Sequence, residues 1–159
     1  MTKLFDYNLT GTGWAEVTLS NETQSVTFEV SYLSDPLSEL YEGLYRLTQN
    51  QSDKEIIVFA DEPGEHSLII AKQDYLNLEI ELYKNDEWEE LSTAMTSTKG
   101  NKELIYSDKD TLQNFISKIC DGTDNLLKRL TLSEYKKLWS QYDFPIEIYG
   151  KIRQPKLLT

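Results

Sequence analysis

Strict alternation of side chains between residues 76 and 83 constrains the fold of this chain most strongly. The apolar residues of the segment fall at every second position, and mostly polar residues fill the positions between them: Leu76, Leu78, Ile80 and Leu82 against Asn77, Glu79, Glu81 and Tyr83. Because successive side chains of a β-strand point to opposite faces, this repeat of two predicts a half-buried strand.

The same repeat occurs in earlier segments. Residues 15–19 and 26–32 alternate in this way, and the turn-like residues 20–23 between them predict a β-hairpin. A shorter strand is expected at about 4–9, before a glycine-containing break. Further strands are expected at 56–60 and 67–72, where Pro63 and Gly64 fit the central positions of a type II turn. Residues 103–106 favour another short strand.

Helical spacing of apolar residues replaces this alternation in three segments. A capping residue followed by Pro36 predicts a helix over 36–49. A longer apolar stripe predicts a second helix from 108 to about 130, disturbed near Gly122. Thr131 and Glu134 form a capping box, which predicts a last helix over 132–142. The remaining tail could add a short strand at 146–149 or lie on the surface.

The order of these elements predicts an α+β fold. We expect a single domain over residues 1–159, a largely antiparallel β-sheet with one helix inserted between strands and two C-terminal helices packed on it. A chain of 159 residues with 39% hydrophobic content suits one core. The N-terminus has no apolar signal core, and the single Cys120 cannot form an internal disulfide, so we expect a cytoplasmic location.

Charge is distributed unevenly along the chain. It holds 16 basic and 27 acidic residues, for a net charge of −11. Residues 1–90 contain 19 acidic and 5 basic residues, whereas residues 91–159 contain 8 acidic and 11 basic residues. Residues 61–90 alone carry ten acids. Such a charge opposes binding to nucleic acid or anionic membranes and favours a basic partner.

Residues typical of catalysis form no recognisable motif. His66 is the only histidine and has no cysteine at zinc-ligand spacing, so we interpret it as an edge-strand histidine. Cys120 is interpreted as a packed thiol. Glu79 and Glu81 would project from one strand face about 7 Å apart. That spacing could hold a metal or serve a glycosidase, but a solvated or protein-binding face suits these acids better. We expect no enzymatic activity, no cofactor and no bound metal.

One tryptophan lies inside an acidic run. Trp88 is flanked by Asp86, Glu87, Glu89 and Glu90. It is either a core anchor with solvated neighbours or an exposed aromatic hot spot ringed by charge. Both interpretations are compatible with the sequence.

Three parts of the chain carry a family resemblance: residues 13–17 leading to 31–37, residues 61–65, and Tyr135 and Trp139 followed by Phe144 and Pro145. In these parts the chain resembles small acidic bacterial immunity proteins of polymorphic and contact-dependent growth inhibition toxin systems. Such proteins bind a cognate toxin domain in the cytoplasm and block it. The resemblance implies a non-enzymatic inhibitor whose partner is the C-terminal domain of a toxin.

Toxin domains that cleave RNA or DNA tend to be basic, so an acidic surface would steer their association. We therefore place the contact surface between residues 61 and 90, with Trp88 as the anchor. The expected partner-binding residues are Asp61, Glu62, Glu79, Glu81, Asp86, Glu87, Trp88, Glu89 and Glu90. The alternative is a small acidic binding or housekeeping protein with a small-ligand or protein-binding pocket and no toxin partner. A third hypothesis is an inhibitor that imitates DNA.

Overall fold

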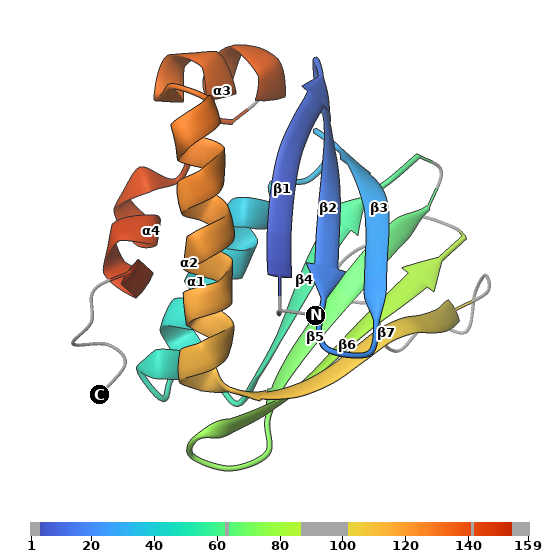
Figure 1. The fold of residues 1–159 in the computed structure, drawn as a ribbon, viewed down its shortest axis with the longest axis vertical. Helices are drawn as coiled ribbons and strands as arrows, with labels where there is room; N and C mark the ends of the chain where they lie inside the picture. The colour runs from blue at the N-terminus through green and yellow to red at the C-terminus, as the bar shows by residue number, and fades with distance from the viewer. Residues whose placement is uncertain (1–3, 63, 87–101, 141, 154–159) are drawn as a thin grey trace.

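The computed structural model describes residues 4–62, 64–86, 102–140 and 142–153, which form seven strands and four helices (Figure 1). The strands are β1 (Leu4–Gly11), β2 (Trp14–Ser20), β3 (Ser25–Ser31), β4 (Lys54–Ala60), β5 (Glu65–Lys72), β6 (Asn77–Asn85) and β7 (Lys102–Thr111). The helices are α1 (Pro36–Thr48), α2 (Leu112–Arg129), α3 (Leu132–Trp139) and α4 (Ile146–Arg153). The predicted α+β class is confirmed.

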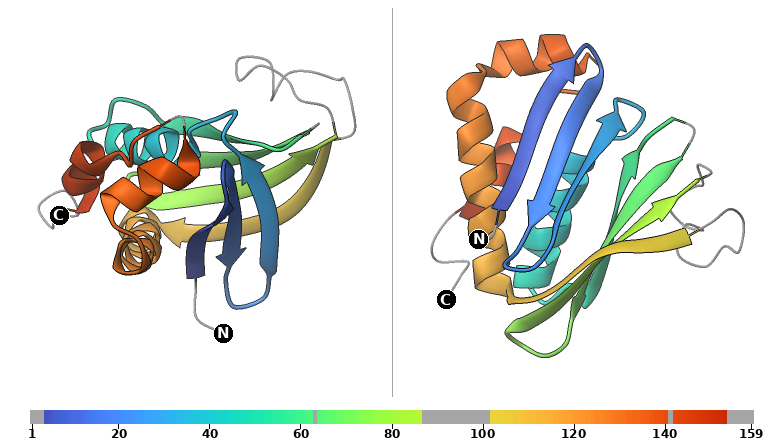
Figure 2. Two further views of the ribbon diagram at one scale, coloured as in Figure 1. Left: turned by 90° about the horizontal axis from the view of Figure 1, so that it is seen from above. Right: turned by 45° about the vertical axis from the view of Figure 1, so that its right-hand side comes forward.

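The strands form two antiparallel sheets where the sequence indicated one. The first has the order β1-β2-β3 and the second the order β4-β5-β6-β7. Figure 2 shows the two sheets inclined to each other, with α2, α3 and α4 gathered on one side of the molecule. Alternation along a strand reports which face is buried but not which strand is its neighbour. The division into two sheets is therefore decided by contacts between distant segments.

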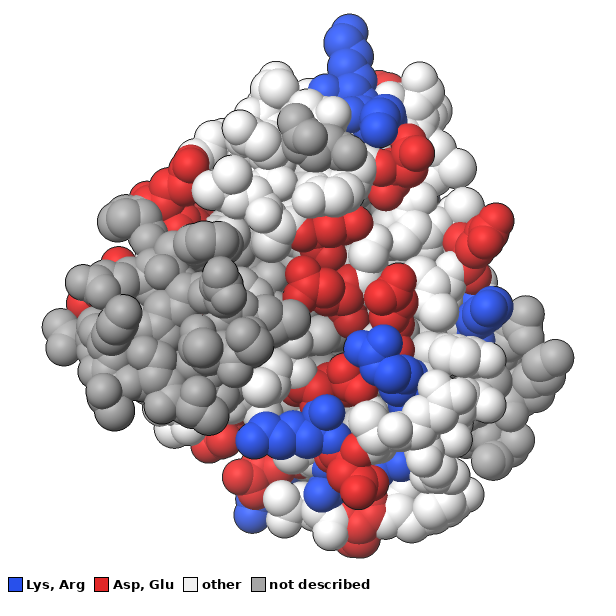
Figure 3. All heavy atoms as spheres, turned by 180° about the vertical axis from the view of Figure 1, so that it is seen from behind, with Lys and Arg blue, Asp and Glu red and all other residues white. Residues whose placement is uncertain are grey.

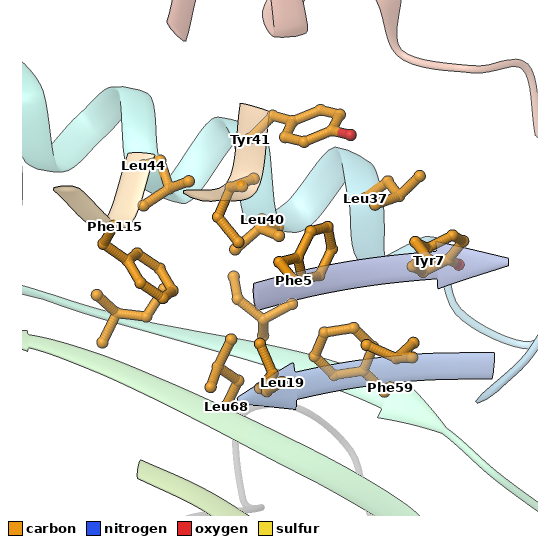
Figure 4. Packing of buried hydrophobic residues seen from close by; sticks show 14 of the residues in the cluster. Phe5, Tyr7, Leu19, Leu37, Leu40, Tyr41, Leu44, Phe59, Leu68 and Phe115 are labelled. Atoms are coloured by element: carbon orange, nitrogen blue, oxygen red, sulfur yellow. The ribbon is translucent and has the colours of Figure 1, made fainter. Parts of the chain in front are cut away.

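One cluster of buried side chains joins both sheets to the helices. Figure 4 shows Phe5, Leu19 and Phe59 from the strands meeting Leu40 of α1. In β6 the predicted face is buried: Leu78, Ile80 and Leu82 are 1%, 0% and 0% exposed. Leu76 is an exception, because it lies in the turn before β6 and is 61% exposed.

Side chains of the β2–β3 turn connect the two sheets. The Gln24 amide donates to the carbonyl oxygen of Ser107 at 3.2 Å and accepts from the N–H of Ser107 at 3.2 Å. Asn21 donates to the same carbonyl at 3.3 Å, while its Oδ1 accepts from the backbone N–H of Gln24 at 2.8 Å. These bonds attach the first sheet to the outer edge of β7.

Helix α2 begins later than the sequence indicated and is not interrupted. β7 continues to Thr111, whose hydroxyl accepts from the N–H of Asn114 at 3.0 Å and caps the helix. The helix runs through Gly122, where a disturbance was expected. A Cβ at Gly122 would lie 2.1 Å from the carbonyl oxygen of Phe5. Glycine is present because α2 lies directly against β1, not because the helix breaks.

The segment after Pro145 is a helix with two buried residues, so neither expectation, a short strand at 146–149 or a tail lying on the surface, was right. Tyr149 and Ile152 of α4 are buried at helical spacing. The Tyr149 hydroxyl donates to the carbonyl of Cys120 at 3.0 Å, and Arg153 donates to Asp124 at 2.7 Å. Docking against α2 therefore stabilises this short helix, which would be marginal alone.

Before α4, the predicted capping box of α3 is present between Thr131 and Glu134, although the helix ends at Trp139. None of the helices in the described ranges is long and apolar enough to cross a membrane.

Candidate protein-binding surface

The predicted partner-binding residues of the β4–β5 turn and of the end of β6 lie at the same end of the second sheet. Asp61 and Glu62 follow β4, and Asp86 follows β6. Glu65, just after the turn, pairs with Asn85, just before Asp86. The structure therefore brings these three acids to one end of the sheet, as a shared surface requires. Four further predicted residues, Glu87, Trp88, Glu89 and Glu90, lie outside the described residues.

Glu79 and Glu81 lie on the face of β6 that points away from the core, and both are half-buried. In the sheet register Glu79 is opposite Lys109, and Glu81 is opposite Ser107. The Tyr83 hydroxyl donates to Glu81 at 3.3 Å. Along an extended strand, the distance to Asn85 is about 20 Å from Glu79 and about 13 Å from Glu81. The β6 acids are thus separated from the acids at the end of the sheet.

His66 lies in the core between the two sheets. Its ring stacks on that of Phe28, with centroids 4.4 Å apart and an interplanar angle of 24°. Burial, with a smaller contribution from the charge of Lys84, lowers the pKa of His66 to about 4. The interpretation as an edge-strand residue was wrong, because β5 lies between β4 and β6. His66 is neutral at pH 7 and packs as an aromatic core residue.

Cys120 is buried on α2, as expected for a packed thiol. Burial, followed by the charge of Asp124, raises the pKa of Cys120 to about 11, so the thiol is protonated at neutral pH. Among the residues that the structure describes, no three His, Cys, Asp or Glu side chains are grouped in a way that could hold a metal ion.

A groove of about 430 Å³ lies between α1 and β4. Its lining residues are Glu39, Glu42, Arg46, Lys54, Glu55, Ile56 and Ile57. A second groove of about 400 Å³, between α1 and α4, shares Glu42 with the first and adds Ile146, Glu147 and Lys151. Glu39 and Glu42 were not among the residues predicted from the sequence to bind a partner. The available signal was their spacing of three residues, which places both on one face of the predicted helix.

Arg46 and Glu55 form a two-pronged ion pair at one end of the first groove. The guanidinium donates from Nε at 2.9 Å and from Nη2 at 2.7 Å. Burial by itself would raise the pKa of Glu55, but hydrogen bonds from Arg46 and Ser52 outweigh it and lower the pKa. Gly43 leaves room for this pair, since a Cβ there would lie 3.2 Å from Glu55 Cγ.

Glu39 lies in a different electrostatic environment within the same groove. Burial raises the pKa of its carboxyl group to about 7, and the charges of Asp35 and Glu42 add to the effect. The N–H of Val58 donates to Glu39 at a long 3.5 Å. The guanidinium of Arg46 is engaged with Glu55, and Lys54 also lines the groove, so Glu39 and Glu42 form its acidic part. A cation placed beside them would relieve their mutual repulsion.

The acidic residues, which are concentrated in the first 90 residues of the chain, are also distributed unevenly over the surface of the folded protein (Figure 3). Residues 4–86 build α1 and the strands β1 to β6, and the less acidic C-terminal part builds β7 and the helices on one side (Figure 2). Figure 3 shows the face on which α1 and β4 lie. Acidic side chains gather down its middle, and basic side chains lie among them in its lower half (Figure 3).

Comparison of the chain with family models, curated proteins and solved structures gives no match. The fold and the distribution of charge are therefore the basis for a functional proposal.

Proposed function

We propose that this protein binds a basic protein partner on the acidic face formed by α1, β4 and the adjoining sheet, and that it serves as an immunity protein against a toxin domain. The single observation that carries the proposal is the gathering of acidic side chains on this face (Figure 3). The chain as a whole carries a net charge of −11, and an acidic face on such a chain would steer a basic partner toward one orientation.

The groove between α1 and β4 suits a basic side chain of such a partner. The carboxylates of Glu39 and Glu42 line it together with the apolar side chain of Ile56. A lysine or arginine packs its aliphatic stem on an apolar surface and directs its charged end to carboxylates. Contact with the cation would lower the pKa of Glu39 from about 7, so binding near neutral pH would release a proton.

Co-purification from the native host tests the proposal. The tagged protein should retain one basic protein in a fixed ratio. With that protein purified, the double reversal Glu39→Lys/Glu42→Lys should slow association at least tenfold at low salt, and added salt should reduce the difference. A matched control is Asp121→Lys/Asp143→Lys, which changes the net charge equally at exposed positions outside the grooves. It should slow association much less.

Equal effects of the two double reversals would contradict the placement of the binding face. A chain that purifies alone would contradict the proposal itself and favour the alternative of a small-ligand binding protein. The observation in favour of that alternative is the size of the groove, about 430 Å³, which lies within the usual range of ligand pockets.

A further inference from the structure

Four buried polar atoms come from β1, the residue before α1, and α3. They are the hydroxyl oxygens of Tyr7 and Tyr135, Asp35 Oδ1 and Trp139 Nε1, and none has a hydrogen-bond partner among the residues that the structure describes. Tyr7, Tyr135 and Trp139 are 0%, 1% and 0% exposed. Buried polar groups in folded proteins nearly always bond to protein or to ordered water.

The side chains that carry these atoms are neighbours. Tyr135 and Trp139 are four residues apart on α3 and therefore share one helix face. The rings of Tyr7 and Trp139 meet edge-on, with centroids 6.4 Å apart. In Figure 4 the ring of Tyr7 lies at the end of α1 that carries Leu37, two residues after Asp35.

The electrostatics of the two hydroxyls agree with this placement. Burial is the largest cause that raises the pKa of Tyr7, and the charges of Tyr135 and Asp35 raise it further. Burial and then the charge of Asp35 likewise raise the pKa of Tyr135. The carboxyl group of Asp35 is thus within electrostatic reach of both hydroxyls.

The hydrogen-bonding capacities of the four atoms fit water. Trp139 Nε1 only donates, the two hydroxyls both donate and accept, and a carboxylate oxygen only accepts. Asp35 Oδ2 already accepts from the Ser38 hydroxyl at 2.7 Å, which leaves Oδ1 for the cluster. An anion would be repelled by the Asp35 carboxylate, and a metal ion would face the indole N–H, which is not a ligand. Water can accept from the indole and donate to the carboxylate.

We propose that Tyr7, Asp35, Tyr135 and Trp139 enclose a site for buried water that joins β1, α1 and α3. The site would hold α3 in place against the first sheet. This helix has eight residues and would be marginal alone. A direct backbone contact, in which the N–H of Gly13 donates to the carbonyl of Leu138 at 2.6 Å, supports the same junction.

A high-resolution crystal structure of the full chain, combined with urea unfolding of variants, tests the site. We expect ordered water within about 2.7–3.2 Å of at least three of the four atoms. Tyr135→Phe and Tyr7→Phe should each lower the urea midpoint, because each removes a partner of that water. Tyr75→Phe is the control, since Tyr75 is 73% exposed and its midpoint should not shift.

Two results would overturn the proposal. One is a crystal structure in which the hydroxyls bond Asp35 directly with no water between them. The other is a dry site in which Tyr135→Phe raises the urea midpoint, because removal of an unpaired buried hydroxyl relieves a desolvation penalty. Neither outcome depends on the identity of a protein partner.

Discussion

The side-chain amide of Gln24 bonds both backbone groups of Ser107, donating to the carbonyl oxygen at 3.2 Å and accepting from the N–H at 3.2 Å. β7 is the last strand of its sheet. The Gln24 amide therefore makes the two hydrogen bonds that the peptide group of a further strand would make with Ser107. At the opposite edge, the hydroxyl of Ser34 accepts from the N–H of Ala60 at 3.0 Å. Side chains thus cover part of both outer strands, which opposes edge-to-edge association.

Gln24→Ala should destabilise the fold by about 1–2 kcal/mol, because two hydrogen bonds of the half-buried Ser107 backbone are lost. Urea unfolding measures the change. Gln24→Glu is an informative companion, since a carboxylate can still accept from the N–H but cannot donate to the carbonyl. If Gln24→Ala changes the free energy of unfolding by less than about 0.5 kcal/mol, the two hydrogen bonds between Gln24 and Ser107 add no net stability.

Gly122→Ala should destabilise the protein by about 2 kcal/mol or more, because the new Cβ would meet the carbonyl of Phe5 and force α2 away from β1. The expected sign is opposite to that of an exposed helix position, where alanine is preferred.

Gly150→Ala in α4 is the matched control for this substitution. Apart from the backbone of α4 itself, no atom of the residues that the structure describes lies within 4 Å of the added Cβ, so the variant should gain up to about 1 kcal/mol. Thermal unfolding of the two variants measures both effects. The same sign in both would contradict the role assigned to Gly122.

The raised pKa of Glu39 should make stability depend on pH. The unfolded carboxyl group ionises near its ordinary pKa of 4.5, whereas the folded one keeps its proton up to about 7. Folding is therefore penalised increasingly as the pH rises from 4.5 to 7, and the penalty is constant above that.

Glu39→Gln removes this penalty, and the side-chain carbonyl of the new glutamine can still accept a hydrogen bond from the backbone N–H of Val58. Its free energy of unfolding should exceed that of the parent by an amount that grows across this pH interval to about 1–3 kcal/mol. Unfolding at several pH values measures the difference. A difference that stays constant from pH 4 to 8 would show that the carboxyl group titrates normally.

Arg46→Met should destabilise the protein at pH 7 by about 1–3 kcal/mol, because the nearly buried carboxylate of Glu55 loses its guanidinium. Glu55 has a lowered pKa in the folded state, so its favourable contribution is present above the ordinary pKa of 4.5 and is lost as the pH falls through the folded value. The cost of Arg46→Met should therefore decrease at acidic pH. Arg46→Met/Glu55→Met should recover part of the loss at pH 7.

Glu87→Lys/Glu89→Lys/Glu90→Lys tests the other acidic segment predicted to contact the partner. If this segment takes part, the triple reversal should slow association with the co-purified partner without lowering thermal stability. Stopped-flow measurements at two salt concentrations provide the readout. Unchanged association would remove the segment from the binding surface and leave the face at α1 and β4.

Local patterns in the sequence determined much of the secondary structure. The alternation at Leu78, Ile80 and Leu82 identified the buried face of β6, and Thr131 with Glu134 identified the start of α3. Each signal lies within a few residues of the element it predicts, because strand faces and helix caps depend on neighbouring side chains. The overall net charge and its concentration in the first 90 residues were likewise fixed by the chain itself.

Only the tertiary structure decided which distant segments meet. It divided the strands into two sheets, placed His66 inside rather than at an edge, and brought α1 beside β4 so that Glu39 and Glu42 line one groove. Gly122 looked like a helix breaker because the carbonyl of Phe5, more than 100 residues earlier, is invisible to a local pattern. Packing between such remote residues, not local propensity, sets these features.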